Sequence, residues 1–202
     1  MNLTILGGIF KGLPWPFPEY RDLRPTSVML RRRVFDKFQN LNNRKFIDLC
    51  CGTGLMGVEA LSRGCEEVYL VEKDKKKLRD LNNLFQSSST FRNLSYLPQL
   101  VQSDCLVFLK SQLQKNSEFF DDAVLYFDPP YELAELYEQF FQFLLLMLSN
   151  KTIQLQNSII LIEFDTLKNK ASKTWTFKEF ENFGLSVSFL KQAQTSLAIL
   201  QK

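Results

Sequence analysis

The stretch Asp48-Leu49-Cys50-Cys51-Gly52-Thr53-Gly54-Leu55-Met56-Gly57 decides the fold class of this chain. It follows the run KFIDLC at 45–50, which we predict to be a short buried strand, and it opens a helix predicted over 55–63. Gly52, Gly54 and Gly57 fit the spacing GxGxxG, in which glycines permit a tight turn and close approach of the backbone to a ligand. A strand, a glycine loop and a helix in this order are typical of α/β sheets that bind nucleoside cofactors.

Two carboxylates accompany this loop. Glu72 ends a strand predicted over 67–72, twenty residues after Gly52, where an acid accepts the ribose hydroxyls of a nucleoside. Asp48 precedes Gly52 by four residues and is well placed for an ammonium group. The glycine motif alone does not separate NAD from S-adenosylmethionine. Asp48 favours S-adenosylmethionine, because NAD has no ammonium group.

Outward from the loop, strands alternate with helices. This alternation predicts an α/β fold with a mostly parallel sheet covered on both faces, and the final two strands predict an antiparallel hairpin at one edge. Before the loop, residues 3–10 indicate a strand or hairpin, residues 12–25 an irregular Pro-rich connection, and Thr26 or Ser27 a cap for a helix over about 27–39. Further strands are predicted at 96–102, 122–127, 157–164, 185–191 and 195–201, and further helices at 74–87, 104–115 and 133–149.

The composition excludes several classes of chemistry. The 202 residues contain no histidine, which rules out Ser-His-Asp and Cys-His triads and metal sites that need histidine. The four cysteines form no CxxC pair, so we expect free thiols in a cytoplasmic protein, and we interpret Cys50 and Cys51 as small buried filler. The apolar run 143–148 is far shorter than a membrane span, and the N-terminus does not resemble a signal peptide. We therefore expect neither a membrane nor a metal partner.

Positive charge is concentrated near the N-terminus. Residues 1–45 carry nine Lys and Arg against three acids, a net charge of +6, whereas the remainder has a net charge of −3. A basic arm on a mildly acidic body predicts a polyanionic partner approached from one end, whereas the charge taken alone is also typical of a solvated surface helix. The candidate RNA-binding residues are Lys11, Arg24, Arg31, Arg32 and Arg33.

A second motif, Asp128-Pro129-Pro130-Tyr131, follows the strand predicted at 122–127. The prolines fix the backbone and end strand pairing, so the Asp128 carboxylate and the Pro129 carbonyl form a rigid pair of acceptors. Such a pair can grip both hydrogens of an exocyclic NH₂, and the Tyr131 ring can stack on the base. The motif also lies at the carboxyl end of a strand, the edge where open α/β sheets bind ligands.

Together these features resemble class I S-adenosylmethionine-dependent amino-methyltransferases. Gly7-Gly8-Ile9-Phe10-Lys11-Gly12, Leu23-Arg24-Pro25-Thr26, Arg31 and Phe35 narrow the resemblance to the RsmD family, which methylates N2 of a guanine in small-subunit ribosomal RNA. The similarity continues more weakly through Ile162-Glu163 and Phe183-Gly184. The chain departs from the family at Val28-Met29, where an acid–arginine pair is usual, and at Cys50-Cys51, where Phe-Ala is usual.

The resemblance implies a role for each motif. Asp48, Gly52 and Gly54 would hold the methionine part of S-adenosylmethionine, Glu72 the ribose, and Asp104 the adenine amino group. Asp128, Pro129, Pro130 and Tyr131 would be catalytic and hold the target base. The Rossmann-like sheet would have seven strands.

We therefore predict a basic extension at 1–44 and a methyltransferase domain at 45–202. The expected reaction is methyl transfer to guanine N2 of 16S rRNA in a partly assembled 30S subunit, by a monomer. Three alternatives stay open: an adenine-N6 methyltransferase on DNA or RNA, a non-catalytic RNA-binding assembly protein, and an NAD-dependent oxidoreductase.

Overall fold

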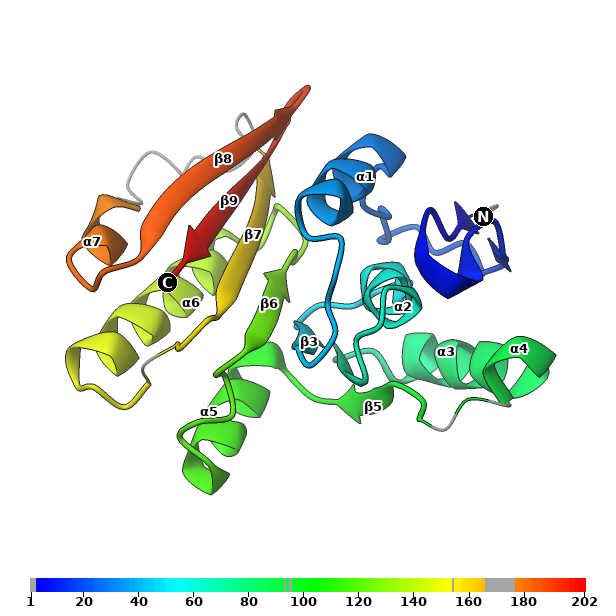
Figure 1. Ribbon diagram of the computed structural model, residues 1–202, viewed down its shortest axis with the longest axis horizontal. Coiled ribbons are helices and arrows are strands. Elements are labelled where there is room, and N and C mark those ends of the chain that lie inside the picture. The colour runs from blue at the N-terminus through cyan, green and yellow to red at the C-terminus, as the bar shows by residue number, and fades with distance from the viewer. Residues whose placement is uncertain (1–2, 93, 95, 154, 166–176) are drawn as a thin grey trace. The chain divides into compact units, whose positions relative to one another are not determined.

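The computed structural model describes residues 3–92, 94, 96–153, 155–165 and 177–202. The chain divides into two compact units, Met1–Cys105 and Leu106–Lys202, whose helices and strands are labelled in Figure 1. Among the described residues, no helix is long and apolar enough to cross a membrane.

Three parallel strands form the sheet of the first unit. They are β3 (Lys45–Asp48), β4 (Glu67–Glu72) and β5 (Gln99–Gln102), with Asp48 opposite Leu70 and Glu72 opposite Gln102. Parallel neighbours require crossover helices, which are α2 (Leu55–Ser62) and α3 (Lys75–Ser87). All of α2 is buried, as its apolar sequence requires, whereas α3 buries one face and is capped by Asp74, which accepts from the Lys76 amide at 2.7 Å.

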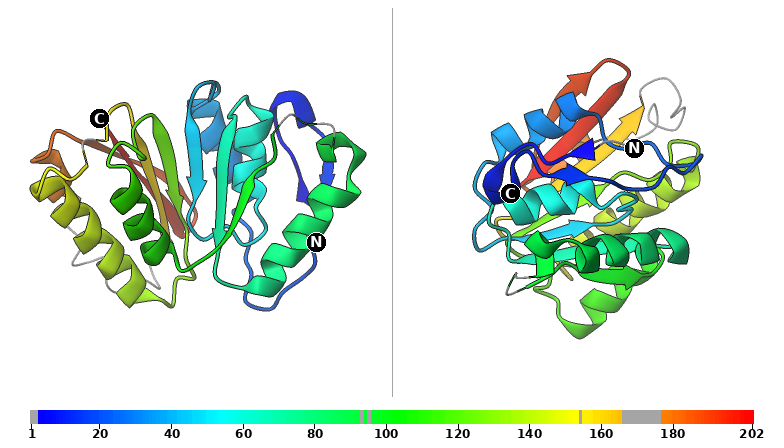
Figure 2. Two further views of the ribbon diagram at one scale, coloured as in Figure 1. Left: turned by 90° about the horizontal axis from the view of Figure 1, so that it is seen from below. Right: turned by 90° about the vertical axis from the view of Figure 1, so that its right-hand side faces the viewer.

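The N-terminal extension packs inside the first unit. It comprises the paired strands β1 (Leu3–Thr4) and β2 (Pro14–Trp15), the 3₁₀ turn η1 (Gly8–Phe10) and α1 (Val28–Lys37). Figures 1 and 2 show its first part running alongside α3 and the short helix α4 (Ser89–Arg92). Trp15 lies 5.3 Å from Phe85 and 5.6 Å from Phe91 between ring centroids. The boundary predicted between residues 44 and 45 stays a prediction.

The second unit holds the remaining strands. In it, β6 (Ala123–Phe127) and β7 (Ile159–Asp165) are parallel, while β8 (Ser186–Gln192) and β9 (Thr195–Gln201) form the antiparallel hairpin, with β9 also antiparallel to β7. Every residue of β6 and β7 is buried. Strands covered on both faces read as continuous apolar runs, which explains these sequences.

Two long helices and one short helix accompany these strands. They are α5 (Cys105–Lys115), α6 (Ala134–Ser149) and α7 (Lys178–Glu181). The Phe140 ring of α6 stacks on Phe127 of β6 at 4.0 Å between centroids. The left view of Figure 2 shows α5 and α6 side by side, and a cavity of about 660 Å³ lies between them, lined by apolar and amide side chains such as Leu106, Gln139 and Leu146.

The strand order of the seven-stranded sheet is β5-β4-β3-β6-β7-β9-β8. This order confirms the predicted fold class of a mostly parallel sheet with an antiparallel C-terminal hairpin. Several details differ from the sequence-based expectation. Only Leu3–Thr4 of the strand or hairpin predicted at 3–10 is a strand, and Gly8–Phe10 form a 3₁₀ turn. Residues 14–15 form β2 within the segment predicted to be irregular, and α4 and α7 were not predicted. β5 begins only at Gln99 because Pro98 has no N–H to donate.

Candidate active site

The glycine loop adopts a conformation that only glycine supports without strain. Gly52 and Gly54 have φ angles of +50° and +69°. A Cβ at Gly52 would lie 2.6 Å from Leu23 Cδ1, and a Cβ at Gly54 would lie 2.7 Å from Leu81 Cδ2. The loop is closed by the Gly54 amide, which donates to the Cys51 carbonyl at 2.7 Å. The positive φ angles therefore favour glycine at both positions, and a larger side chain would also displace the two leucine methyl groups.

Asp48 lies at the end of β3 and is 1% exposed. Burial raises its carboxyl pKa well above the usual value, with the Glu72 charge adding to this, while hydrogen bonds from the backbone at Cys50 and Gly57 oppose it. Among the described residues, its Oδ1 has no hydrogen-bond partner. A buried carboxyl oxygen without a donor is costly, so this atom fits a ligand that brings a positive group or an N–H.

Glu72 joins the glycine loop directly. Its Oε2 accepts from the Gly52 amide at 3.1 Å and its Oε1 from the Asp74 amide at 2.9 Å. Each carboxylate oxygen has two lone pairs, so both can also accept a ribose hydroxyl. Asp104 follows β5 and is 36% exposed in its side chain, with the Lys73 Nζ at 4.0 Å.

The first unit therefore brings all five predicted cofactor residues to the carboxyl ends of three parallel strands. Asp48 follows from β3, Glu72 from β4 and Asp104 from just beyond β5, while Gly52 and Gly54 form the loop beside them. A buried carboxyl with an unsatisfied oxygen, a carboxylate held by backbone amides and a glycine turn fit an adenosine cofactor that carries an ammonium group.

The loop cysteines are free thiols. Cys51 is 6% exposed, and burial raises its pKa well above the usual value. Cys50 is half-buried and hydrogen-bonded to Cys105, a contact that raises its pKa together with burial. Raised thiol pKa values keep the reactive thiolate form scarce.

The Asp-Pro-Pro-Tyr motif directly follows β6 in the second unit. Asp128 and Tyr131 are half-buried, Pro129 is buried and Pro130 is exposed. The Pro129 carbonyl accepts from the Tyr137 hydroxyl at 3.1 Å, and the Tyr131 hydroxyl donates to Glu163 Oε1 at 3.0 Å. Tyr126, Tyr137 and Glu163 escaped the sequence analysis as site residues. The one signal available was an acid, Glu163, within the apolar run 159–164.

Burial raises the pKa of the Tyr131 phenol well above its usual value, and the Glu163 and Asp128 charges add to the shift. A side-chain hydrogen bond with Thr195 opposes it. The phenol is consequently neutral, so that it donates a hydrogen bond to the carboxylate.

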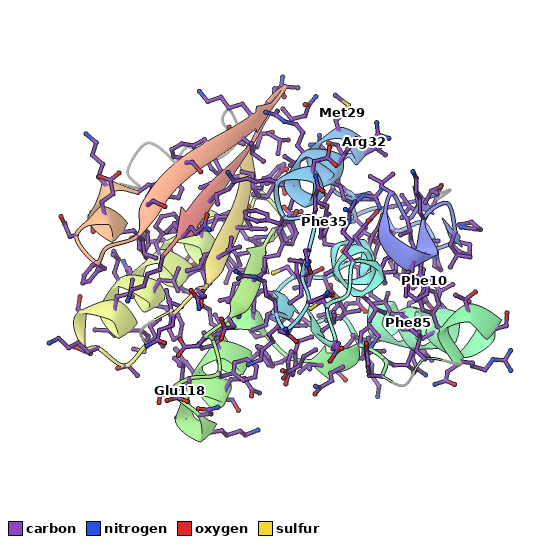
Figure 3. The ribbon with its side chains drawn as sticks, in the orientation of Figure 1. Phe10, Met29, Arg32, Phe35, Phe85 and Glu118 are labelled. Carbon is purple, nitrogen blue, oxygen red and sulfur yellow. The ribbon has the colours of Figure 1, made fainter. Side chains whose placement is uncertain are left out.

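The basic residues divide into two groups. Lys11, Arg24, Arg32 and Arg33 are exposed, and Figure 3 shows Arg32 with Met29 on the outer side of α1, opposite Phe35. The burial of Arg31, which is 1% exposed, contradicts the prediction that it contacts RNA phosphate. Arg31 donates to the Thr4 carbonyl at 3.0 Å and pairs with the buried Glu59 at 3.5 Å. Arg31 therefore joins α1 to α2 and the N-terminal strand.

Known proteins of similar sequence identify the family of this chain. Residues 3–189 match the family described as "Conserved hypothetical protein 95". The chain belongs to this family. A relative from Haemophilus influenzae named "Ribosomal RNA small subunit methyltransferase D" is 28% identical over 190 residues, covering 91% of this chain and 90% of the relative. A relative of the same name from Buchnera aphidicola subsp. Acyrthosiphon pisum is 26% identical, covering 87% and 85%.

The fold of the family member matches a solved methyltransferase structure. The "putative methyltransferase yhhF from Escherichia coli" superposes with a TM-score of 0.72 at 19% identity, covering 100% of this chain and 98% of that one. The resemblance to the RsmD family is thereby confirmed. These relatives carry methyltransferase names, so the NAD-dependent oxidoreductase alternative loses its support.

Proposed function

We propose that this member of the family transfers a methyl group from S-adenosylmethionine to the exocyclic N2 of a guanine in 16S ribosomal RNA. The observation that carries the proposal is the Asp128–Pro129 acceptor pair directly after β6, in a chain whose relatives are named small-subunit rRNA methyltransferases. A carboxylate beside a fixed carbonyl can accept both hydrogens of one amino group.

The first unit would hold the methyl donor, which supplies an electrophilic methyl on its sulfonium. Asp48 would bind the ammonium group through the oxygen that lacks a partner. Glu72 would accept the ribose hydroxyls with the lone pairs left by two backbone amides. Asp104 would accept the adenine amino group, and the turn at Gly52 and Gly54 allows close approach of the ligand.

The second unit would hold the target base. Asp128 and the Pro129 carbonyl would accept the two N–H groups of the amine and so direct the nitrogen lone pair. Tyr131 would stack on the base, which must leave its own stack to reach such a site. Because the sulfonium is already a strong methyl donor, most of the rate enhancement would come from positioning.

Exposed basic residues would contact the RNA backbone. Lys11, Arg24, Arg32 and Arg33 are exposed within the basic extension, whereas residues 46–202 have a net charge of −3. This distribution supports approach of a polyanion from the extension. We further propose that the substrate is a partly assembled 30S subunit, that the enzyme is a monomer, and that it works in the cytoplasm.

The decisive experiment is tritiated methyl transfer to 30S particles from a strain lacking the protein, followed by digestion to nucleosides. The expected product is N2-methylguanosine. N6-methyladenosine would instead support the alternative that shares the Asp-Pro-Pro-Tyr motif, and no transfer by the intact chain would support a non-catalytic role.

Asp128→Ala provides the matched variant in this assay. We expect turnover to fall by about 10²–10³-fold, because the amine loses one of its two anchors. Folding and S-adenosylhomocysteine binding should stay near normal. Near wild-type transfer by this variant would contradict the assigned role.

A further inference from the structure

Three tyrosine hydroxyls converge on one buried acid in the second unit. Tyr126 donates to Glu163 Oε2, and Tyr131 donates to Oε1 at 3.0 Å. The Tyr137 hydroxyl lies 2.9 Å from the backbone carbonyl of the same glutamate. We call Tyr126, Tyr131, Tyr137 and Glu163 the tyrosine–glutamate cluster.

The cluster is buried at an energetic cost. Glu163 is 3% exposed, Tyr126 is 2% exposed and Tyr137 is fully buried. Placing a carboxylate in such surroundings is unfavourable unless its oxygens are hydrogen-bonded, and here each oxygen receives a phenol proton. An apolar side chain would satisfy the core at this position of β7 more simply, so a purely structural account does not explain the acid.

The cluster includes Tyr131 of the motif and contacts two more of its residues, Asp128 and Pro129. Tyr131 belongs to the motif itself, and Tyr126 lies 3.4 Å from Asp128 Oδ2. The Tyr137 hydroxyl reaches the Pro129 carbonyl at 3.1 Å as well as the Glu163 carbonyl. A hydroxyl has one proton, so Tyr137 shares its proton between the carbonyl of Pro129, just after β6, and the carbonyl of Glu163 within β7.

We propose that Glu163 is a positioning residue for methyl transfer, which acts by fixing the Tyr131 ring on which the target base stacks. The inference rests on the proposed function. Tyr131 is held at its hydroxyl by Glu163 and by a side-chain hydrogen bond with Thr195. A ring whose hydroxyl is held presents one face in a fixed orientation. Binding of a base then costs less conformational entropy, because the ring is already ordered.

A double-mutant cycle tests the proposal. Tyr131→Phe and Glu163→Met are assayed singly and together by methyl transfer to 30S particles at saturating S-adenosylmethionine, with kcat and KM for the particles measured separately. We expect each single variant to lose about 10-fold in kcat/KM and the double variant also to lose about 10-fold, because both remove the same tether. The loss should appear mainly in KM, since the ring captures the base.

Two readouts separate positioning from a merely structural role. Thermal unfolding and S-adenosylhomocysteine affinity should change little in Tyr131→Phe, because the ring and its packing stay. Tyr69→Phe is the matched control, since it removes a tyrosine–glutamate hydrogen bond of 2.7 Å to Glu67 on β4, outside every predicted site residue. Its kcat/KM should equal that of the wild type.

The outcomes distinguish the inference from the proposed function. If the wild type methylates 30S particles and the double variant loses about 100-fold, the two effects are independent and the positioning role of Glu163 is wrong. If the wild type transfers no methyl group, the proposed function fails, and this inference fails with it. Should Glu163→Met not fold, Glu163→Leu replaces it in the cycle, because it also removes the oxygen that accepts from Tyr131. Additivity in that cycle would likewise overturn the proposal.

Discussion

At the scale of single residues, Asp48 is a buried carboxyl whose pKa is raised by its surroundings. Burial and the Glu72 charge hold its carboxyl pKa well above the usual value of 3.8 in the chain without ligand. The folded chain therefore binds this proton more tightly than the unfolded chain. The resulting stability is present below the unfolded pKa and is lost as the pH rises through the folded pKa.

A bound ammonium group reverses this preference, which gives the first prediction. Because a neighbouring positive charge favours the carboxylate, binding of S-adenosylhomocysteine should release a proton between the usual pKa of Asp48 and its raised value. We expect affinity to increase with pH across this range and then to level off. Calorimetry in two buffers of different ionisation enthalpy counts the released protons.

Asp48→Asn is the control for this measurement. It keeps the shape of the side chain but cannot titrate, so proton release should disappear, and affinity should fall by about 10- to 100-fold with the lost charge-assisted hydrogen bond. Equal proton release in Asp48→Asn would show that another group titrates on binding.

At the level of single elements, α1 presents two faces with different roles. Ser27 caps the helix by accepting from the Leu30 amide at 3.2 Å, and Leu30, Arg31, Val34 and Phe35 form its buried face. Arg32 and Arg33 lie on the exposed face with Val28 and Met29, which are 51% and 54% exposed. Arg32 and Arg33, together with the exposed Lys37 at the end of the helix, therefore form its outward positive charge.

Reversal of this charge gives a prediction for RNA binding. Arg32→Glu with Arg33→Glu should weaken RNA binding and reduce the slope of log affinity against log salt by roughly 1 per lost phosphate contact. Lys110→Glu with Lys115→Glu on α5 changes the net charge equally and should leave the slope unchanged. Equal losses from both pairs would mean that net charge, rather than α1, governs binding.

The sequence predicted most elements of this fold because their patterns are local. The strand 67–72 and the helix boundaries of α2 and α3 agree with the structure within one residue, since each depends on apolar spacing, a cap or a glycine stop nearby in the chain. The two short helices α4 and α7 depend on packing of Phe91 and Phe180, which no local pattern reveals.

The same reasoning explains which site residues were found. Asp48 and Glu72 follow from spacing to the glycine loop. The burial of Arg31 depends on Glu59, 28 residues away, and the contact of Tyr131 with Glu163 spans 32 residues. Such pairings arise only when distant elements pack together. The arginine run at 31–33 therefore did not indicate Glu59 as a partner, and the acid in the apolar strand did not indicate Tyr131.

For the whole molecule, the N-terminal extension is part of the first unit's core and not a detachable arm. Phe17 and Trp15 are each 1% exposed, and the Trp15 indole donates to the Thr53 carbonyl of the glycine loop at 2.8 Å. Tyr20 donates to Asp80, and Lys77 pairs with Asp22 at 2.6 Å, both across to α3. The extension thus supports the loop that would bind the cofactor.

This packing predicts that the chain depends on its extension for folding. Phe17→Ala should lower the free energy of unfolding by about 3–5 kcal/mol, because it leaves a cavity in a closely packed aromatic core. Ile9→Ala is the matched control, since Ile9 is 76% exposed, and its effect should stay within about 0.5 kcal/mol.

A chain lacking residues 1–44 should unfold at a lower temperature and bind S-adenosylhomocysteine weakly, because the Thr53 carbonyl and the apolar face of α3 lose their cover. Denaturant unfolding followed by tryptophan fluorescence measures the two point variants, and circular dichroism with calorimetry measures the shortened chain. If residues 45–202 alone fold with the stability of the full chain and bind the ligand equally well, the extension is an independent arm after all, and its contacts with the glycine loop do not support the site.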